Sequence, residues 1–245
     1  SSDNGGITLN GAITTDGAVT IDGPVTLATG AVSVTTANDA ISFNHSIDGG
    51  QTLTLSSGSA AITFTGALGA STSLGGLTVN SAGAGNITFS STIGDAENAG
   101  VAGTTAIGNA ATNDLNFNST IYSFNGATTI TAKSGDTIDL AAGAATQFLT
   151  SNDNITFATG NIELANGSDL TVDTGAEGGN ITIGDIDGAS QETVTLDAGT
   201  GTTSVGVIGS GTEIGVLTIG SSDNGGITLN GAITTDGAVT IDGPV

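Results

Sequence analysis

The chain has 245 residues, of which 23 are Asp or Glu and only one, Lys133, is Lys or Arg, so its formal net charge is −22. This balance argues against a nucleic-acid or anionic-membrane partner, because both need several basic side chains, and it favours cations as partners. The absence of Cys excludes disulfides, thiolate zinc sites and cysteine nucleophiles. The sequence contains no run of 18 apolar residues, so it predicts no membrane-spanning helix.

Short phrases in which a polar or small residue separates two apolar ones recur along the chain. They begin at residues 7, 25, 41, 62, 87, 115, 138, 155, 181 and 205, and again at 227. Alternation with a period of two predicts a strand with one face in a core and one in water. Ten such units fill positions 1–220.

Aligning these phrases predicts two apolar columns inside the fold. The first column is Ile7, Val25, Ile41, Ile62, Ile87, Leu115, Ile138, Ile155, Ile181 and Val205. The other is Leu9, Leu27, Phe43, Phe64, Phe89, Phe117, Leu140, Phe157, Ile183 and Val207. Five of the seven Phe residues share this second column, so Phe64 and Phe89 are predicted to be buried neighbours.

Further strands are predicted within each unit. A second apolar position follows six residues after the first at Ile13, Ile47, Leu68, Ile93 and Ile121. More alternating phrases begin at 19, 32, 53, 77, 170, 194 and 217. Gly, Asn, Asp and Ser separate them, as is typical of turns, and no helical periodicity of useful length competes. The fold class is therefore expected to be all-β.

Units of about 22 residues with a constant register predict a parallel β-solenoid of about ten coils per 220-residue repeat. At about 4.8 Å per coil, one repeat would be about 48 Å long. A string of antiparallel sandwiches is the alternative, since Asp-Gly turns at 16, 22, 48 and 187 suit hairpins. A sandwich gives no reason for one column pattern in ten successive units. Residues 95–113 depart from the pattern and are expected to form a loop outside the coil.

The segment at positions 1–25 returns without change at 221–245. We therefore divide the chain into one full repeat, residues 1–220, and the start of the next identical repeat, residues 221–245. Only "SSDNGG", a turn-like stretch, stands at the junction. The solenoid is expected to be uncapped and continuous with neighbouring repeats, so that the chain is a window from a tandem array.

Residues 73–94 carry Leu74, Gly75, Leu77, Thr78, Val79, Gly85, Ile87, Thr88 and Phe89 in the pattern L-G-x-L-T-V-x-x-x-G-x-I-T-F. In this pattern the chain resembles the repeats of giant secreted bacterial surface proteins of the filamentous-haemagglutinin and large-adhesin type. The likeness extends in weaker form over nearly the whole chain. It implies a β-solenoid exported to the cell surface or beyond, and it carries over no functional site.

Asp185 and Asp187 are the candidate metal ligands. They lie on one side of a strand or turn in "GDIDG", and carboxylates in such turns suit Ca²⁺. The sequence requires no cofactor, and Ca²⁺ is the one that these turns would suit. Solenoid glycosidases and lyases also use acid pairs, but a single Tyr, Lys and His offer little to hold a sugar, so no enzyme is expected.

His45, Lys133 and Tyr122 are expected to be solvent-facing turn residues. The outward Thr column could order water as in ice-binding solenoids, but Asn116, Asp139 and Gly206 interrupt it.

The sequence thus favours a structural extracellular protein that forms a rod-like surface filament, sheath fibre or adhesin stalk. Its expected partners are adjacent repeats of the same chain, sister filaments in lateral bundles and divalent cations. The alternatives are an adhesin that binds a glycan or host receptor through the solenoid turns, and a calcium-dependent protein of the surface-layer type.

Overall fold

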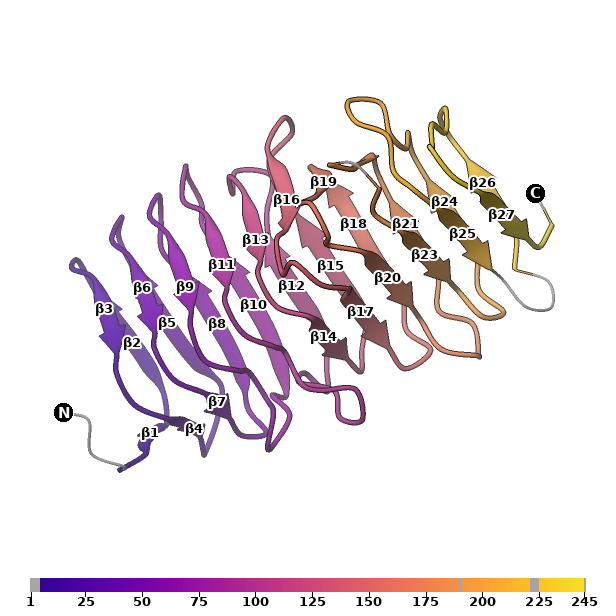
Figure 1. The fold of residues 1–245 in the computed structure, drawn as a ribbon. Coiled ribbons are helices and arrows are strands. Elements are labelled where there is room, and N and C mark those ends of the chain that lie inside the picture. The colour runs from indigo at the N-terminus through magenta and orange to yellow at the C-terminus, as the bar shows by residue number, and fades with distance from the viewer. Residues whose placement is uncertain (1–4, 190, 221–224, 245) are drawn as a thin grey trace.

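The computed structural model describes residues 5–189, 191–220 and 225–244, and every strand pairing in these ranges is parallel. The turns stack in one row, with β1 and β27 at opposite ends of the stack (Figure 1). This arrangement is a parallel β-solenoid of about nine turns, which confirms the predicted fold class. Among the described residues there is no helix long and apolar enough to cross a bilayer.

Three faces form the walls, and the chain visits them in the order A, B, C. Face A begins with three strands and continues, through single-residue bridges at Leu68 and Ile93, into six more. Its strands are β1 (Ile7–Leu9), β4 (Val25–Leu27), β7 (Ile47–Asp48), β14 (Ile121–Phe124), β17 (Thr146–Thr150), β20 (Leu170–Asp173), β23 (Val194–Asp197), β25 (Leu217–Gly220) and β27 (Val239–Asp242).

Face B is one continuous sheet of ten strands. Its strands are β2 (Ala12–Thr15), β5 (Val32–Thr36), β8 (Thr52–Ser56), β10 (Gly76–Asn80), β12 (Thr105–Gly108), β15 (Thr128–Thr131), β18 (Ile155–Thr159), β21 (Ile181–Ile183), β24 (Thr203–Val205) and β26 (Ile227–Leu229).

Face C has eight strands and continues through bridges at Ile208 and Ile233. Its strands are β3 (Val19–Ile21), β6 (Ile41–Phe43), β9 (Ile62–Phe64), β11 (Ile87–Phe89), β13 (Leu115–Phe117), β16 (Thr137–Leu140), β19 (Asn161–Leu164) and β22 (Ile186–Asp187).

The predicted columns combine members of all three faces. Ile41, Ile62, Ile87, Leu115 and Ile138 do form one ladder on face C. Ile7 and Val25 instead pair on face A, and Ile155, Ile181 and Val205 lie on face B. The phrases are alike on every face and the loops between them vary in length, so aligning phrases cannot assign faces. The count of about ten coils is corrected to about nine turns for the same reason.

Aromatic rings fill the middle of the interior. Phe43, Phe64, Phe89 and Phe117 stack nearly parallel on face C, with successive centroids 5.9, 4.8 and 5.3 Å apart. The predicted contact between Phe64 and Phe89 is therefore confirmed. Phe157 lies on face B beside Ile130 and meets the other rings only through Phe148.

The corners between faces explain the Gly and Ser content. At the corner before face B, a Cβ on Gly103 would lie 2.2 Å from the carbonyl oxygen of Gly75, and one on Gly126 would lie 2.5 Å from that of Gly103. Only glycine allows turns to stack this closely. At other corners a buried hydroxyl closes the turn, as where Ser57 donates to the carbonyl of Ala60 at 2.5 Å.

The expected loop at 95–113 is shorter than predicted. Only residues 95–99 leave the wall: the Gly94 N–H still donates to the Leu68 carbonyl and the Gly100 N–H to that of Ser123. Ile93 and Val101, on either side of this loop, both bridge to β14. The chain then returns to face B in β12.

Candidate functional site: the carboxylate column of face C

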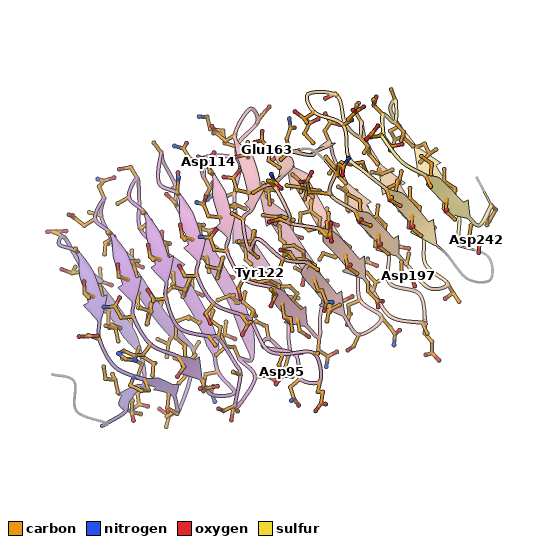
Figure 2. The ribbon with its side chains drawn as sticks, viewed as in Figure 1. Asp95, Asp114, Tyr122, Glu163, Asp197 and Asp242 are labelled. Atoms are coloured by element: carbon orange, nitrogen blue, oxygen red, sulfur yellow. The ribbon has the colours of Figure 1, made fainter. Side chains whose placement is uncertain are left out.

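A column of carboxylates runs along the outside of face C. Asp139 in β16 is the in-register partner of Glu163 in β19, and Glu163 is the partner of Asp187 in β22. Asn116 in β13 precedes them in the same column. Because side chains alternate along a strand and parallel turns stack in register, outward acids at equivalent positions must lie above one another. Figure 2 shows Glu163 with Asp114 at the same edge of the solenoid.

The column borders a groove of about 420 Å³ on this face. Asn116, Asp139, Leu140, Ala141, Glu163, Leu164, Ala165, Gly188 and Ala189 line it. None of these nine lining residues is basic or aromatic. The groove therefore offers carboxylates and small apolar side chains, and it suits cations better than sugars or anions.

Two carboxyl groups of the column, those of Asp139 and Glu163, hold their protons more strongly than usual. Partial burial raises the pKa of Asp139, and the nearby Asp114 carboxylate raises it further. Burial is also the main cause of the raised pKa of Glu163, followed by the charges of Asp139 and Asp187. Neighbouring like charges favour the neutral form, so Asp139 and Glu163 become protonated at a higher pH than ordinary Asp and Glu side chains.

The two candidate calcium ligands, Asp185 and Asp187, lie on either side of Ile186. Each carboxylate accepts a hydrogen bond from a different backbone N–H group. Asp185 Oδ1 accepts a hydrogen bond from the Val207 N–H at 2.7 Å. Asp187 Oδ1 accepts one from the Gly211 N–H at 2.7 Å. In the described ranges no three acidic, His or Cys side chains come together as a metal-binding group. Calcium at Asp185 and Asp187 stays a prediction.

Asp185 belongs to a recurring hydrogen-bond arrangement that the sequence analysis did not predict. Asp and Asn residues directly before a strand accept a backbone N–H from the next turn, and so join successive corners. The contacts run from Thr137 N to Asp114 (3.2 Å), Asn180 N to Asn154 (2.9 Å), Thr193 N to Asp169 (2.7 Å) and Thr202 N to Asn180 (2.8 Å). The sequence signal is an Asp or Asn immediately before the first apolar residue of a strand.

Two of the three residues expected at solvent-facing turns are exposed. His45 is 52 % exposed, with Nε2 3.5 Å from Asp22 Oδ1, and Lys133 is 53 % exposed, with Nζ 3.2 Å from Asp136 Oδ2.

The expectation for Tyr122 is wrong, because this side chain is fully buried and stacks on Phe148 at 5.1 Å. Its hydroxyl accepts the Ser119 N–H at 2.9 Å. The predicted inward residue, Ile121, is half-buried instead. Burial raises the pKa of Tyr122 well above its ordinary value.

Comparison of the chain with protein-family models, with curated proteins and with solved structures gives no match. The parallel pairing of the strands defines the chain as a parallel β-solenoid.

Proposed function

We propose that the protein is a structural, extracellular repeat segment that forms a rod: a surface filament, a sheath fibre or an adhesin stalk. The observation that carries the proposal is that both described ends of the solenoid expose the same apolar segment on complementary sides. The ends therefore fit copies of each other.

Incomplete burial of the interior is confined to the two ends. Along the middle of the solenoid, the inward Ile, Leu, Val and Phe side chains are buried. The partly buried members that pack against this core are Ile7, Leu9, Ile13 and Val19 at one end, and Leu229, Ile233 and Ile241 at the other. Val239 in β27 is 45 % exposed. Each end thus leaves apolar surface that a further turn would cover.

The duplicated segment is covered on opposite sides in its two copies. In the first copy, later turns cover it, because Ile7 pairs with Val25 and Val19 pairs with Ile41. In the second copy, earlier turns cover it, as Val239 pairs with Leu217. The two sets of contacts are compatible, so one segment can join the end of one repeat to the start of the next. The boundary at 220/221 itself borders residues 221–224, which lie outside the described ranges.

Two further features support a rod outside the cell. The outer surface is acidic and rich in Thr, while the load along the axis would fall on continuous parallel hydrogen bonding. The likeness to filamentous-haemagglutinin-like repeats, which the solenoid fold is compatible with, supports export to the surface. The adhesin and calcium-dependent alternatives stay predictions.

Arrays of one, three and five repeats, imaged by electron microscopy, test the proposal. Slightly more than nine turns per repeat should lengthen a continuous rod by about 45 Å per copy, instead of the about 48 Å expected from ten coils. Arrays in which Ile7 of each copy is replaced by Asp, which breaks the junction, provide the control and should show kinks or gaps at that spacing. Separate globular beads in the unmodified array would overturn the proposal.

A further inference from the structure

The two copies of the duplicated segment lie on different faces of the solenoid. In the first copy, Ile7 is on face A, Ile13 on face B and Val19 on face C. Their equivalents in the second copy are each one face further on: Ile227 on face B, Ile233 on face C and Val239 on face A. Identical sequence thus adopts strand structure in two phases of the same fold.

The segment can do this because it is a six-residue repeat. Ile7, Ile13, Val19 and Val25 are equally spaced, and each is followed by Thr. One hexad makes one face, and three hexads make the 18-residue turn that brings Val25 back over Ile7. Since every hexad presents an inward β-branched residue and an outward Thr, none is tied to a particular face.

The short segment between β25 and β26 explains why the second copy starts on a different face from the first. Face A ends at Gly220 in β25, and the next apolar position is Ile227. Ile227 is only seven residues after Gly220, whereas a return to face A takes three hexads, or 18 residues, even in the short turn from Ile7 to Val25. Ile227 therefore reaches only the next face, B.

The 220-residue period consequently contains a fractional number of turns. Face B holds ten strands from β2 to β26, which is nine turns, and β1 precedes β2 by one face. The step from Ile7 to Ile227 is therefore nine turns and one third.

We propose that successive copies in the tandem array are rotated by one third of a turn, and that the open edge of β26 and β27, which begin the second copy, is the surface that receives the following turns of that copy in this rotated phase. This inference rests on the proposed function, because it requires a continuous rod. Each face of one copy continues into a different face of the next. The carboxylate column of face C is then displayed on all three sides in turn and returns to the first side after three copies, or about 134 Å. Such a rod offers the same column to neighbouring rods of its own kind in three directions.

A marker in the protruding loop tests the rotation. Asp95 and its neighbours form this loop outside the wall (Figure 2), so a hexahistidine tag inserted after Ala96 leaves the interior intact. Arrays of six copies, labelled with nickel-chelate gold, are imaged by cryo-electron tomography. Successive gold particles should lie about 45 Å apart along the rod and circle it, with every third particle on the same side.

In the control array, the sequence of residues 13–24 is duplicated in every copy by inserting the same twelve residues again after Pro24. These two added hexads bring each copy to ten whole turns, so the gold should lie along one side except for the gradual twist of the sheets. Gold aligned in the unmodified array and circling in the control would overturn the inference and leave the rod in place. Loss of a continuous rod in the unmodified array would instead overturn the proposed function.

Discussion

Individual ring positions explain why the middle of the solenoid is aromatic. Phe43, Phe64, Phe89 and Phe117 occupy one inward column, and in-register stacking sets their separation close to the spacing of parallel strands. Tyr122 ends this stack edge-on, with its centroid 4.8 Å from that of Phe117. Each ring is therefore held by rings in neighbouring turns, and a change in one affects several turns.

Replacement of Phe89 by Asp is expected to destabilise the turns on both sides. The variant removes a fully buried ring and places a charge between Phe64 and Phe117, at a cost of more than about 5 kcal/mol. Thermal unfolding followed by circular dichroism measures the effect. Ser90→Asp, on the exposed residue next in the chain, is the matched control and should change the midpoint little. Equal midpoints for Phe89→Asp and the unmodified protein would contradict the interior stack.

Because Tyr122 is buried, we expect the folded protein to lose stability at alkaline pH. Its pKa is raised in the folded state by burial, so its contribution is complete below the ordinary pKa of about 10 and is lost as the pH rises towards the folded value. Because the chain has a single Tyr, tyrosinate absorbance reports on this residue alone. We expect that absorbance to appear together with unfolding above about pH 10.

Tyr122→Phe removes the ionisable hydroxyl and should flatten the alkaline pH dependence. At neutral pH the same variant should lose about 1 kcal/mol, because the Ser119 N–H loses its acceptor. Tyrosinate absorbance in a protein whose circular dichroism is still native would show that the side chain is accessible.

At the scale of single elements, the sequence predicts strands well and faces poorly. The phrases at 32, 53, 77, 170, 194 and 217 all form strands, because alternation and turn residues are local signals. Whether a phrase lies on face A, B or C depends on the number of residues in every preceding corner, which no local pattern reports. The predicted column therefore drifts from face A to face C and then to face B.

The candidate site was predictable only in part, for a related reason. Asp185 and Asp187 were found because they are near each other in sequence. The column of Asp139, Glu163 and Asp187 joins residues far apart in the chain, and it becomes visible only when the register of β16, β19 and β22 is known. The hydrogen bonds of the Asp side chains that precede strands could not be predicted either, because their donors are backbone N–H groups of the next turn.

We expect the folded protein to become more stable when one charge of the carboxylate column, that of Glu163, is removed. Burial and neighbouring carboxylates raise the pKa of Glu163 in the folded state, so the favourable contribution is present below the ordinary pKa of 4.5 and is lost as the pH rises through the raised value. Glu163→Gln should therefore raise the melting temperature at pH 7 by about 1–2 °C and weaken its fall between about pH 4 and 7. The control is Glu97→Gln, in the loop outside the wall, and an equal gain there would assign the effect to net charge alone.

At the scale of the whole molecule, we expect charge density to govern any association between the proposed rods. Three of the 23 acidic residues lie in 221–245, so residues 1–220 carry 20 acids and one Lys. Over a rod of about 45 Å this is about one net charge per 2.4 Å, far closer than the Debye length of about 8 Å at physiological ionic strength. Rods should therefore repel each other when only monovalent ions are present at low concentration.

Divalent cations are expected to reverse this repulsion and bundle the rods side by side. The carboxylate column concentrates charge in a groove, and in the rotated array it faces neighbours on three sides, so bound Mg²⁺ or Ca²⁺ can neutralise two rods at once. Light scattering from arrays should rise at millimolar divalent ion and stay flat in NaCl of equal ionic strength. Arrays in which Asp139→Asn, Glu163→Gln and Asp187→Asn are combined should need more cation to bundle than arrays that lose three acids outside the column, at Asp16, Asp39 and Glu97. Equal thresholds for the two variants would assign bundling to total charge, and flat scattering of the unmodified array throughout the titration would exclude cation-bridged contact between rods.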